Sequence, residues 1–196
     1  MELPMSVPCS GRDVVLLHIP RTGGTARRIS LHGQQDKVWV PIPEHDTRYS
    51  EVYDLDATII VYVRHPVARF VSAWRRHPDP RWPHPDDLAL SGPKCLYGLT
   101  SPDYREAMWW VDAEINERNT YLFATESMSW TWPRLMATLG VDAAPLRPPQ
   151  PILTRVPALS EAAREAVEDW YSDDLSLWNR AIHRRAGLGE ASVTSD

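Results

Sequence analysis

The chain reads Val14-Val-Leu-Leu-His-Ile-Pro-Arg-Thr-Gly-Gly-Thr25, and this stretch decides the fold. Its first part is a short apolar run typical of a buried strand, and its second part is a proline followed by a glycine-rich turn. A parallel strand that runs into such a turn and then a helix brings backbone N–H groups to the positive end of that helix, where an anion is stabilised. The stretch therefore predicts a phosphate-binding loop. It is not a Walker P-loop, because the spacing Gly-x4-Gly-Lys-Ser/Thr is absent.

A second strand-to-helix junction follows in the middle of the chain. Residues 58–63 are an unbroken β-branched and aromatic run, as expected of a strand covered on both faces. Arg64 leaves the end of this strand, Pro66 stands where a first-turn proline belongs, and Ser72 lies two helical turns further on. Because parallel strands end at one edge of a sheet, we expect Arg64 and Ser72 to converge on one phosphate there.

Strand and helix signals alternate along the first two thirds of the chain, which favours an α/β fold with a parallel sheet flanked by helices. A helix is expected from Pro66, and Ser160 is expected to cap the last helix. The other expected strands are residues 14–18, 38–40 and 120–124, and the other expected helices are residues 25–31, 47–53, 102–116, 127–139 and 160–178.

Length and composition indicate a single domain over residues 1–196, with a core at 13–183, a proline-rich surface loop at 77–100 and a tail at 187–196. The net charge of -5 argues against nucleic acid as a partner. Two cysteines are too few for a disulfide framework or a zinc site, which indicates a reducing compartment. The sequence contains no apolar run long enough to cross a membrane and no signal peptide pattern, so we expect no stable membrane insertion.

Two motifs resemble those of one enzyme family. His18-Ile-Pro-Arg-Thr-Gly-Gly-Thr25 resembles the 5'-phosphosulfate loop of sulfotransferases that use 3'-phosphoadenosine-5'-phosphosulfate (PAPS), usually His-x-Pro-Lys-Thr-Gly-Gly-Thr. Arg64-His-Pro-Val-Ala-Arg-Phe-Val-Ser72 is similar to the family's 3'-phosphate motif, Arg-Asp-Pro-x-x-Arg-x-x-Ser. Weaker similarities at 125–126 and 168–178 extend the likeness over residues 14–180. The resemblance implies the sulfotransferase fold, with residues 77–100 on the acceptor side.

The resemblance also assigns residues to the PAPS donor. Arg21 stands where the family has a lysine that contacts the bridging oxygen, and it keeps the charge but cannot give up a proton. Arg69 matches the family's second arginine, with a structural and a ligand-facing role both open. The residues that the resemblance assigns to donor binding are Arg21, Thr22, Gly23, Gly24, Thr25, Arg64, Ser72 and Arg155.

A base and an acceptor surface are the remaining expectations. Residues 43–52 resemble the family stretch Lys-His-x-Thr-x-x-Glu-hydrophobic, which makes His45 the expected base, with Glu44 and Asp46 as alternatives. An ordinary histidine pKa of ~6.5 suits that task. Trp82, Trp109 and Trp110 are candidates for an aromatic platform under the acceptor, with core packing as the alternative.

The resemblance implies metal-independent, in-line transfer of a sulfuryl group from PAPS to a hydroxyl of a saccharide, glycolipid or small metabolite. Because animal relatives carry a membrane anchor, the missing anchor implies a bacterial, cytoplasmic version. Two alternatives stay open: a nucleotide-dependent phosphotransferase on the same kind of sheet, and a module that binds 3'-phosphoadenosine nucleotides without turnover. The sequence does not indicate an oligomeric state.

Overall fold

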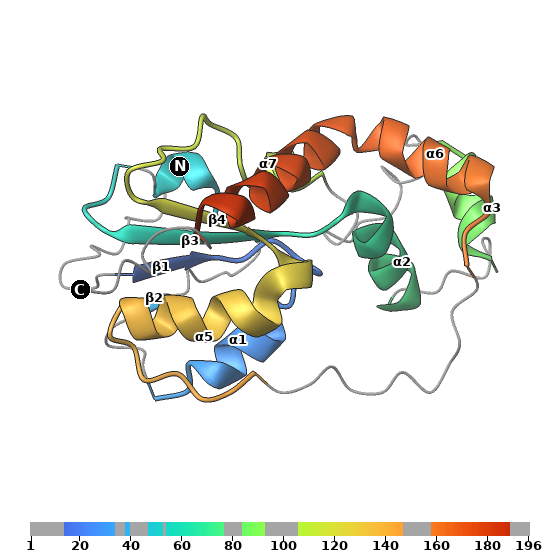
Figure 1. Cartoon of the computed structure of the whole chain (residues 1–196). Helices are drawn as coiled ribbons and strands as arrows, with labels where there is room; N and C mark the ends of the chain where they lie inside the picture. The colour runs from blue at the N-terminus through green and yellow to red at the C-terminus, as the bar shows by residue number, and fades with distance from the viewer. Residues whose placement is uncertain are drawn as a thin grey trace, which may run out of the picture.

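A parallel sheet forms the centre of the molecule (Figure 1). The computed structural model describes residues 14–33, 38–39, 47–52, 54–76, 84–92, 106–146 and 158–188. Its strands are β1 (Val14–Leu17), β2 (Val38–Trp39), β3 (Thr58–Val63) and β4 (Thr120–Ala124), in the order β2-β1-β3-β4. All the pairings are parallel, so the expected α/β architecture is confirmed.

The register places the carboxyl ends of three strands side by side. Leu17 of β1 pairs with Val61 of β3, and Val63 of β3 pairs with Ala124 of β4. The residues that follow these strands therefore lie at one edge of the sheet, which is where ligands bind in open α/β sheets.

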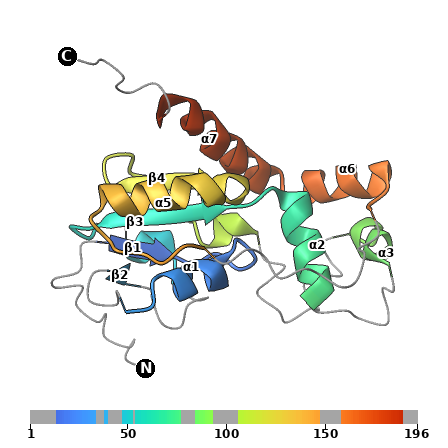
Figure 2. The same cartoon turned by 60° about the horizontal axis from the view of Figure 1, so that its bottom comes forward.

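Helices cover both faces of the sheet (Figures 1 and 2). Alternate residues of β1 point to opposite faces, as the pleat requires: Val15 and Leu17 join one core, and Val14 and Leu16 join the other. The first core includes α7 (Ser172–Leu188) with two short 3-10 helices, η1 (Tyr49–Glu51) and η3 (Ala107–Trp109).

The second core lies between the sheet and two helices, α1 (Gly24–Ser30) and α5 (Met128–Thr138). A 3-10 turn, η4 (Thr125–Ser127), leads from β4 into α5. The helices expected after β1 and β4 are thus confirmed, and Gly140 follows α5 with a positive φ of 63°.

A third apolar cluster lies beside the sheet's carboxyl edge, where α2 (Pro66–Arg76), α3 (Pro85–Leu90) and α6 (Glu161–Trp170) pack together (Figures 1 and 2). Ser160 caps α6 as expected, its hydroxyl accepting the Ala163 N–H at 3.3 Å. Within the described ranges, no helix is both long enough and apolar enough to cross a membrane.

Three expectations about regular structure are wrong. The proline-rich segment contains a helix, α3, because His84 accepts the Asp86 N–H at 3.2 Å and Pro85 occupies the first turn. The expected helix at 102–116 is, from residue 106 on, only the short η3. The expected last helix is two helices, α6 and α7, separated at Tyr171.

A buried ion pair explains why the expected helix at 102–116 is only the short η3 from residue 106 on. The Arg69 guanidinium donates to the Asp174 carboxylate at 3.0 Å, and these side chains are only 2% and 1% exposed. The same carboxylate accepts the backbone N–H groups of Ala107 (2.7 Å) and Met108 (3.0 Å), so α2, α7 and η3 meet at one charge. Arg69 therefore has a structural role.

We expect Asp174→Ala to lower the free energy of unfolding by about 3–5 kcal/mol, because the buried Arg69 guanidinium would lose the carboxylate that neutralises it. Urea unfolding followed by tryptophan fluorescence measures this loss. Asp173→Ala, which removes an exposed carboxylate from the adjacent position, is the matched control and should cost far less. Similar losses in the two variants would contradict a structural role for the pair.

Candidate functional site

The loop after β1 makes a tight turn before α1. Arg21 has a positive φ of 66°, and Gly23 has a φ of 81°. Glycine suits the second position, because a Cβ added there would come within 2.8 Å of the Met128 methyl carbon. Among the described residues, Arg21 is the sole non-glycine residue with positive φ, so its conformation must be held by its surroundings.

Thr22 holds the loop from inside. The residue is fully buried, and its hydroxyl donates to the Ile19 carbonyl at 2.7 Å. Its carbonyl accepts the Arg27 guanidinium at 2.7 Å and lies 3.3 Å from the Thr125 hydroxyl. The Thr125 hydroxyl also lies 3.0 Å from the Val63 carbonyl, which ties the loop to the end of β3. The side chain of Thr22 thus shapes the loop and does not face solvent.

The structure brings together three of the predicted donor-binding residues. The Arg21 guanidinium reaches α2, where its Nε and Nη2 atoms lie 3.1 and 2.9 Å from the Ser72 hydroxyl, and Nη2 donates to the Ser72 carbonyl at 3.1 Å. Arg64 donates in turn to the Arg21 carbonyl at 3.2 Å. The sequence motifs assigned Arg21 and Ser72 to different phosphates, and the direct contact between them was not expected.

Positive charge accumulates at this edge of the sheet. Burial lowers the pKa of the half-buried Arg64 guanidinium, Glu126 opposes that shift, and the positive charges of Arg21 and Arg75 lower the pKa further. Arg21 and Arg75 therefore disfavour the charged form of Arg64. A bound anion would relieve the repulsion, so the site is electrostatically suited to phosphate or sulfate groups.

The Glu126 carboxylate is fixed beside this cluster. It accepts the backbone N–H of His65 at 3.1 Å and the indole N–H of Trp178 at 3.1 Å. The His65 ring packs edge-on against Trp178, with 4.5 Å between the ring centroids, and its Nε2 lies 3.8 Å from Glu168. The helices α2, α6 and α7 are therefore held together next to Arg64.

The structure describes some of the other predicted site residues and not the rest. Gly24 and Thr25 are the first residues of α1. His45, Trp82 and Arg155 lie outside the described residues, so their roles stay predictions.

The aromatic platform is not supported at Trp110, which is fully buried in the core. Trp109 packs against Trp110 with 5.1 Å between the ring centroids, and the Arg48 guanidinium lies 4.3 Å from the centroid of a Trp109 ring. Arg48 and Trp110 thus occupy much of the surface that Trp109 would offer to an acceptor.

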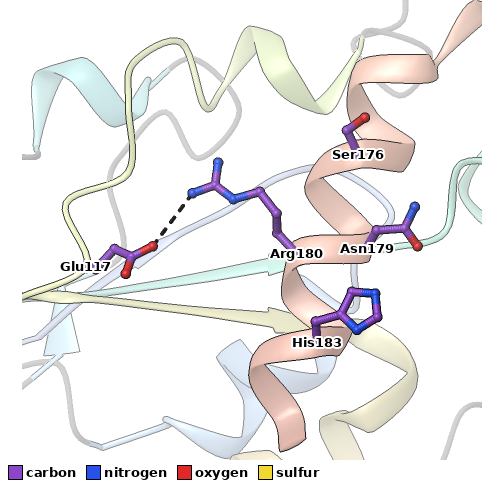
Figure 3. A pocket seen from close by; sticks show the side chains of 5 residues that line it. All are labelled: Glu117, Ser176, Asn179, Arg180 and His183. Carbon is purple, nitrogen blue, oxygen red and sulfur yellow. Dashed lines mark ion pairs between the residues drawn. The ribbon is translucent and has the colours of Figure 1, made fainter. Parts of the chain in front are cut away.

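An open depression of about 640 Å³ lies on the outer side of α7 (Figure 3). Ser176, Asn179, Arg180 and His183 project from α7 along its wall, and Glu117 faces Arg180 at 3.9 Å. The described residues of the predicted donor site do not line it, so this depression is separate from Arg21, Arg64 and Ser72.

Comparison with family models, curated proteins and solved structures finds no match for the chain. The geometry of the loop and of the cation cluster is therefore the basis for any assignment.

Sequence reasoning missed Arg27. The residue is fully buried, and it shares the inner face of α1 with Ser30 and Leu31. The spacing of three and four residues along the helix was the available signal, because it places all three side chains on one face.

We expect Gly23→Ala to lower the free energy of unfolding by about 1–2 kcal/mol through its positive φ, and by a smaller further amount through crowding against the flexible end of the Met128 side chain. Gly33→Ala is a matched control, because its φ is 87° but nothing lies within 4 Å of the added carbon. Urea denaturation gives the loss of unfolding free energy in each variant, and the difference between the two losses measures the effect of crowding by Met128. Equal losses would show that Met128 does not restrict the loop.

Proposed function

We propose that the protein is a PAPS-dependent sulfotransferase that transfers a sulfuryl group to a hydroxyl of a saccharide, lipid or small metabolite. The observation that carries this proposal is the meeting of Arg21, Arg64 and Ser72 at the carboxyl edge of the parallel sheet. These residues come from the two motifs that resemble the donor-binding motifs of that family. Mutual repulsion among the cations supports a polyanionic donor such as PAPS.

In this proposal Arg21 and the loop at 22–25 bind the 5'-phosphosulfate end, and Arg64 with Ser72 binds the 3'-phosphate. The Arg21–Ser72 hydrogen bond is compatible with both roles. A hydroxyl accepts with its lone pairs and donates with its own proton, so Ser72 can accept from Arg21 and donate to a phosphate oxygen at the same time. Ser72 would then couple the two ends of the donor.

The proposed transfer is a direct displacement. The acceptor oxygen forms a bond to sulfur as the bond between sulfur and the 5'-phosphate oxygen breaks, and the acceptor proton passes to a base. Arg21 stabilises the charge on the departing phosphate by electrostatics, because a guanidinium does not give up a proton. His45 is the proposed base, and 3'-phosphoadenosine-5'-phosphate (PAP) is the product. The proposed reaction is metal-independent, and the proposed setting is the bacterial cytoplasm.

Two other functions fit the sheet and the loop. A nucleotide-dependent phosphotransferase would also place phosphates at this edge, but it would require a divalent cation. A transfer assay in EDTA separates the two classes, since activity lost in EDTA and restored by magnesium indicates the phosphotransferase. A module that only binds 3'-phosphoadenosine nucleotides would bind PAP tightly and would transfer no sulfuryl group from PAPS to saccharide, lipid or small-metabolite hydroxyls.

The first test of the proposal concerns the donor. We expect PAP to bind more tightly than 5'-AMP in isothermal titration, and we expect Arg64→Ala and Ser72→Ala each to reduce this preference. A charge-assisted hydrogen bond contributes about 1.5–3 kcal/mol, which corresponds to about ten- to a hundred-fold in affinity.

Arg76→Ala is the control for the donor test, because it removes an exposed arginine from the end of α2, which carries Ser72, and changes the net charge as much as Arg64→Ala does. It should leave the preference for PAP unchanged. Equal affinity of the wild-type protein for PAP and 5'-AMP would remove the basis for a 3'-phosphate site.

The second test concerns the base. We expect His45→Ala to lower kcat by about a hundred-fold or more while the Kd for PAP stays near the wild-type value, because a lost general base affects chemistry and not donor binding. The wild-type rate should fall below a pH of about 6–7 as an unperturbed imidazole becomes protonated. His32→Ala, at an exposed histidine, is the control. A wild-type kcat in His45→Ala would move the role to Glu44, Asp46 or another residue.

A further inference from the structure

Arg27 is a buried cation directly beneath the loop. Its side chain is fully buried. The guanidinium donates to the Thr22 carbonyl at 2.7 Å and lies 3.3 Å from the Thr22 hydroxyl. It also lies 3.5 Å from the Met128 sulfur and 4.4 Å from the centroid of the Tyr62 ring. All of these groups are neutral acceptors or a neutral ring, so they solvate the charge without cancelling it.

No carboxylate neutralises Arg27 among the described residues, and its Nε atom has no hydrogen-bond partner there. Arg69, the other buried arginine in those ranges, contrasts with it by pairing with Asp174. Burial lowers the pKa of Arg27 to about 10, so the group stays protonated at neutral pH. Burial also raises the pKa of Tyr62 to about 12, so the tyrosine is neutral and does not serve as its counter-ion.

A buried charge without a counter-charge normally destabilises a protein, because no interaction compensates for the lost hydration. The missing counter-charge must therefore come from outside the described chain or be tolerated at a cost to stability. The loop that Arg27 holds is the one to which the proposed function assigns the donor's 5'-phosphate end. The bound phosphate group can supply the missing negative charge.

Arg27 also sets the direction of a backbone donor. A trans peptide points its C=O and its N–H to opposite sides. Because the Thr22 carbonyl is held inward by Arg27 and Thr125, the N–H of the next residue, Gly23, is turned outward. Gly23 is partly exposed, whereas Thr22 is fully buried. The outward N–H is therefore presented on the accessible side of the loop.

We propose that Arg27 is a positioning residue for anion binding, which holds the Gly23 N–H toward the donor's 5'-phosphate end and supplies a buried positive charge that this anion neutralises. The inference rests on the proposed function for the identity of the anion. It predicts that a neutral substitution lowers the affinity for the anion but does not lower the stability of the ligand-free protein. Replacing Arg27 with a neutral side chain of similar length should weaken anion binding without weakening the free fold.

The experiment compares Arg27→Met with Arg28→Met, an exposed arginine at the next position whose loss changes the net charge equally. We expect Arg27→Met to lower the affinities for PAP and for 5'-AMP by the same factor, about tenfold or more, because both ligands carry a 5'-phosphate. The urea midpoint of the ligand-free protein should stay the same or rise. Arg28→Met should change neither affinity appreciably.

Two further variants separate charge from hydrogen bonding. Arg27→Lys keeps the charge and should retain more affinity than Arg27→Met. Arg27→Gln is neutral but can still donate to the Thr22 carbonyl, and it also serves as the neutral variant if Arg27→Met does not fold. Affinity in Arg27→Gln at the Arg27→Lys level would overturn the role of the charge.

The outcomes keep this inference distinct from the proposed function. If wild-type protein binds PAP and 5'-AMP equally, the PAPS assignment fails, yet an equal loss in Arg27→Met still supports a positioning role. If neutral variants unfold more easily and bind both nucleotides as tightly as wild type, Arg27 is only structural and the inference is overturned. It is also overturned if the wild-type protein binds neither nucleotide nor inorganic pyrophosphate.

Discussion

The shape of the loop depends on one atom, the Thr22 carbonyl oxygen. It accepts the Arg27 guanidinium from α1, and it lies within hydrogen-bond distance of the Thr125 hydroxyl that follows β4. The same hydroxyl lies within hydrogen-bond distance of the Val63 carbonyl at the end of β3. One carbonyl and one hydroxyl thus join the carboxyl ends of three strands. This junction fixes where Arg21 and Arg64 start, and hence where their charges can meet.

The arginines near the loop and the arginine buried beside α7 differ in how their charges are compensated. The whole chain carries a net charge of -5, but the edge around the loop gathers Arg21, Arg64 and Arg75 with Glu126 as an opposing charge. Deeper in the fold, Arg69 is neutralised by Asp174, whereas the groups around Arg27 in the described ranges are neutral. The fold therefore keeps positive charge near the loop at a cost in desolvation, whereas the buried arginine with a structural role, Arg69, is neutralised by a carboxylate. That difference favours an anionic ligand at the loop over a purely structural explanation.

The sequence predicted the parts of the fold that local patterns determine. The strands at 58–63 and 120–124 match their expected bounds, because burial on both faces leaves an unbroken apolar signal. The helix expected at 102–116 failed from residue 106 on, because Asp174, far along the chain, takes the N–H groups of Ala107 and Met108. Arg27 was missed for a related reason. An arginine at a core-facing position contradicts the usual apolar pattern, and only the three-dimensional contacts show what it holds.

Position 21 holds an arginine where the sulfotransferase motif that this loop resembles has a lysine, and the arginine has a geometric role. Its backbone is in the left-handed region, which disfavours a non-glycine residue, and the Arg64 contact to its carbonyl helps to hold it there. The forked guanidinium contacts both the hydroxyl and the carbonyl of Ser72, 51 residues away, through two of its nitrogens. A lysine has a single nitrogen on a flexible stem and would not fix the same orientation. Arg21 therefore connects the loop to α2 before any ligand arrives, and a donor that bridges the two motifs would meet a site whose halves are already joined.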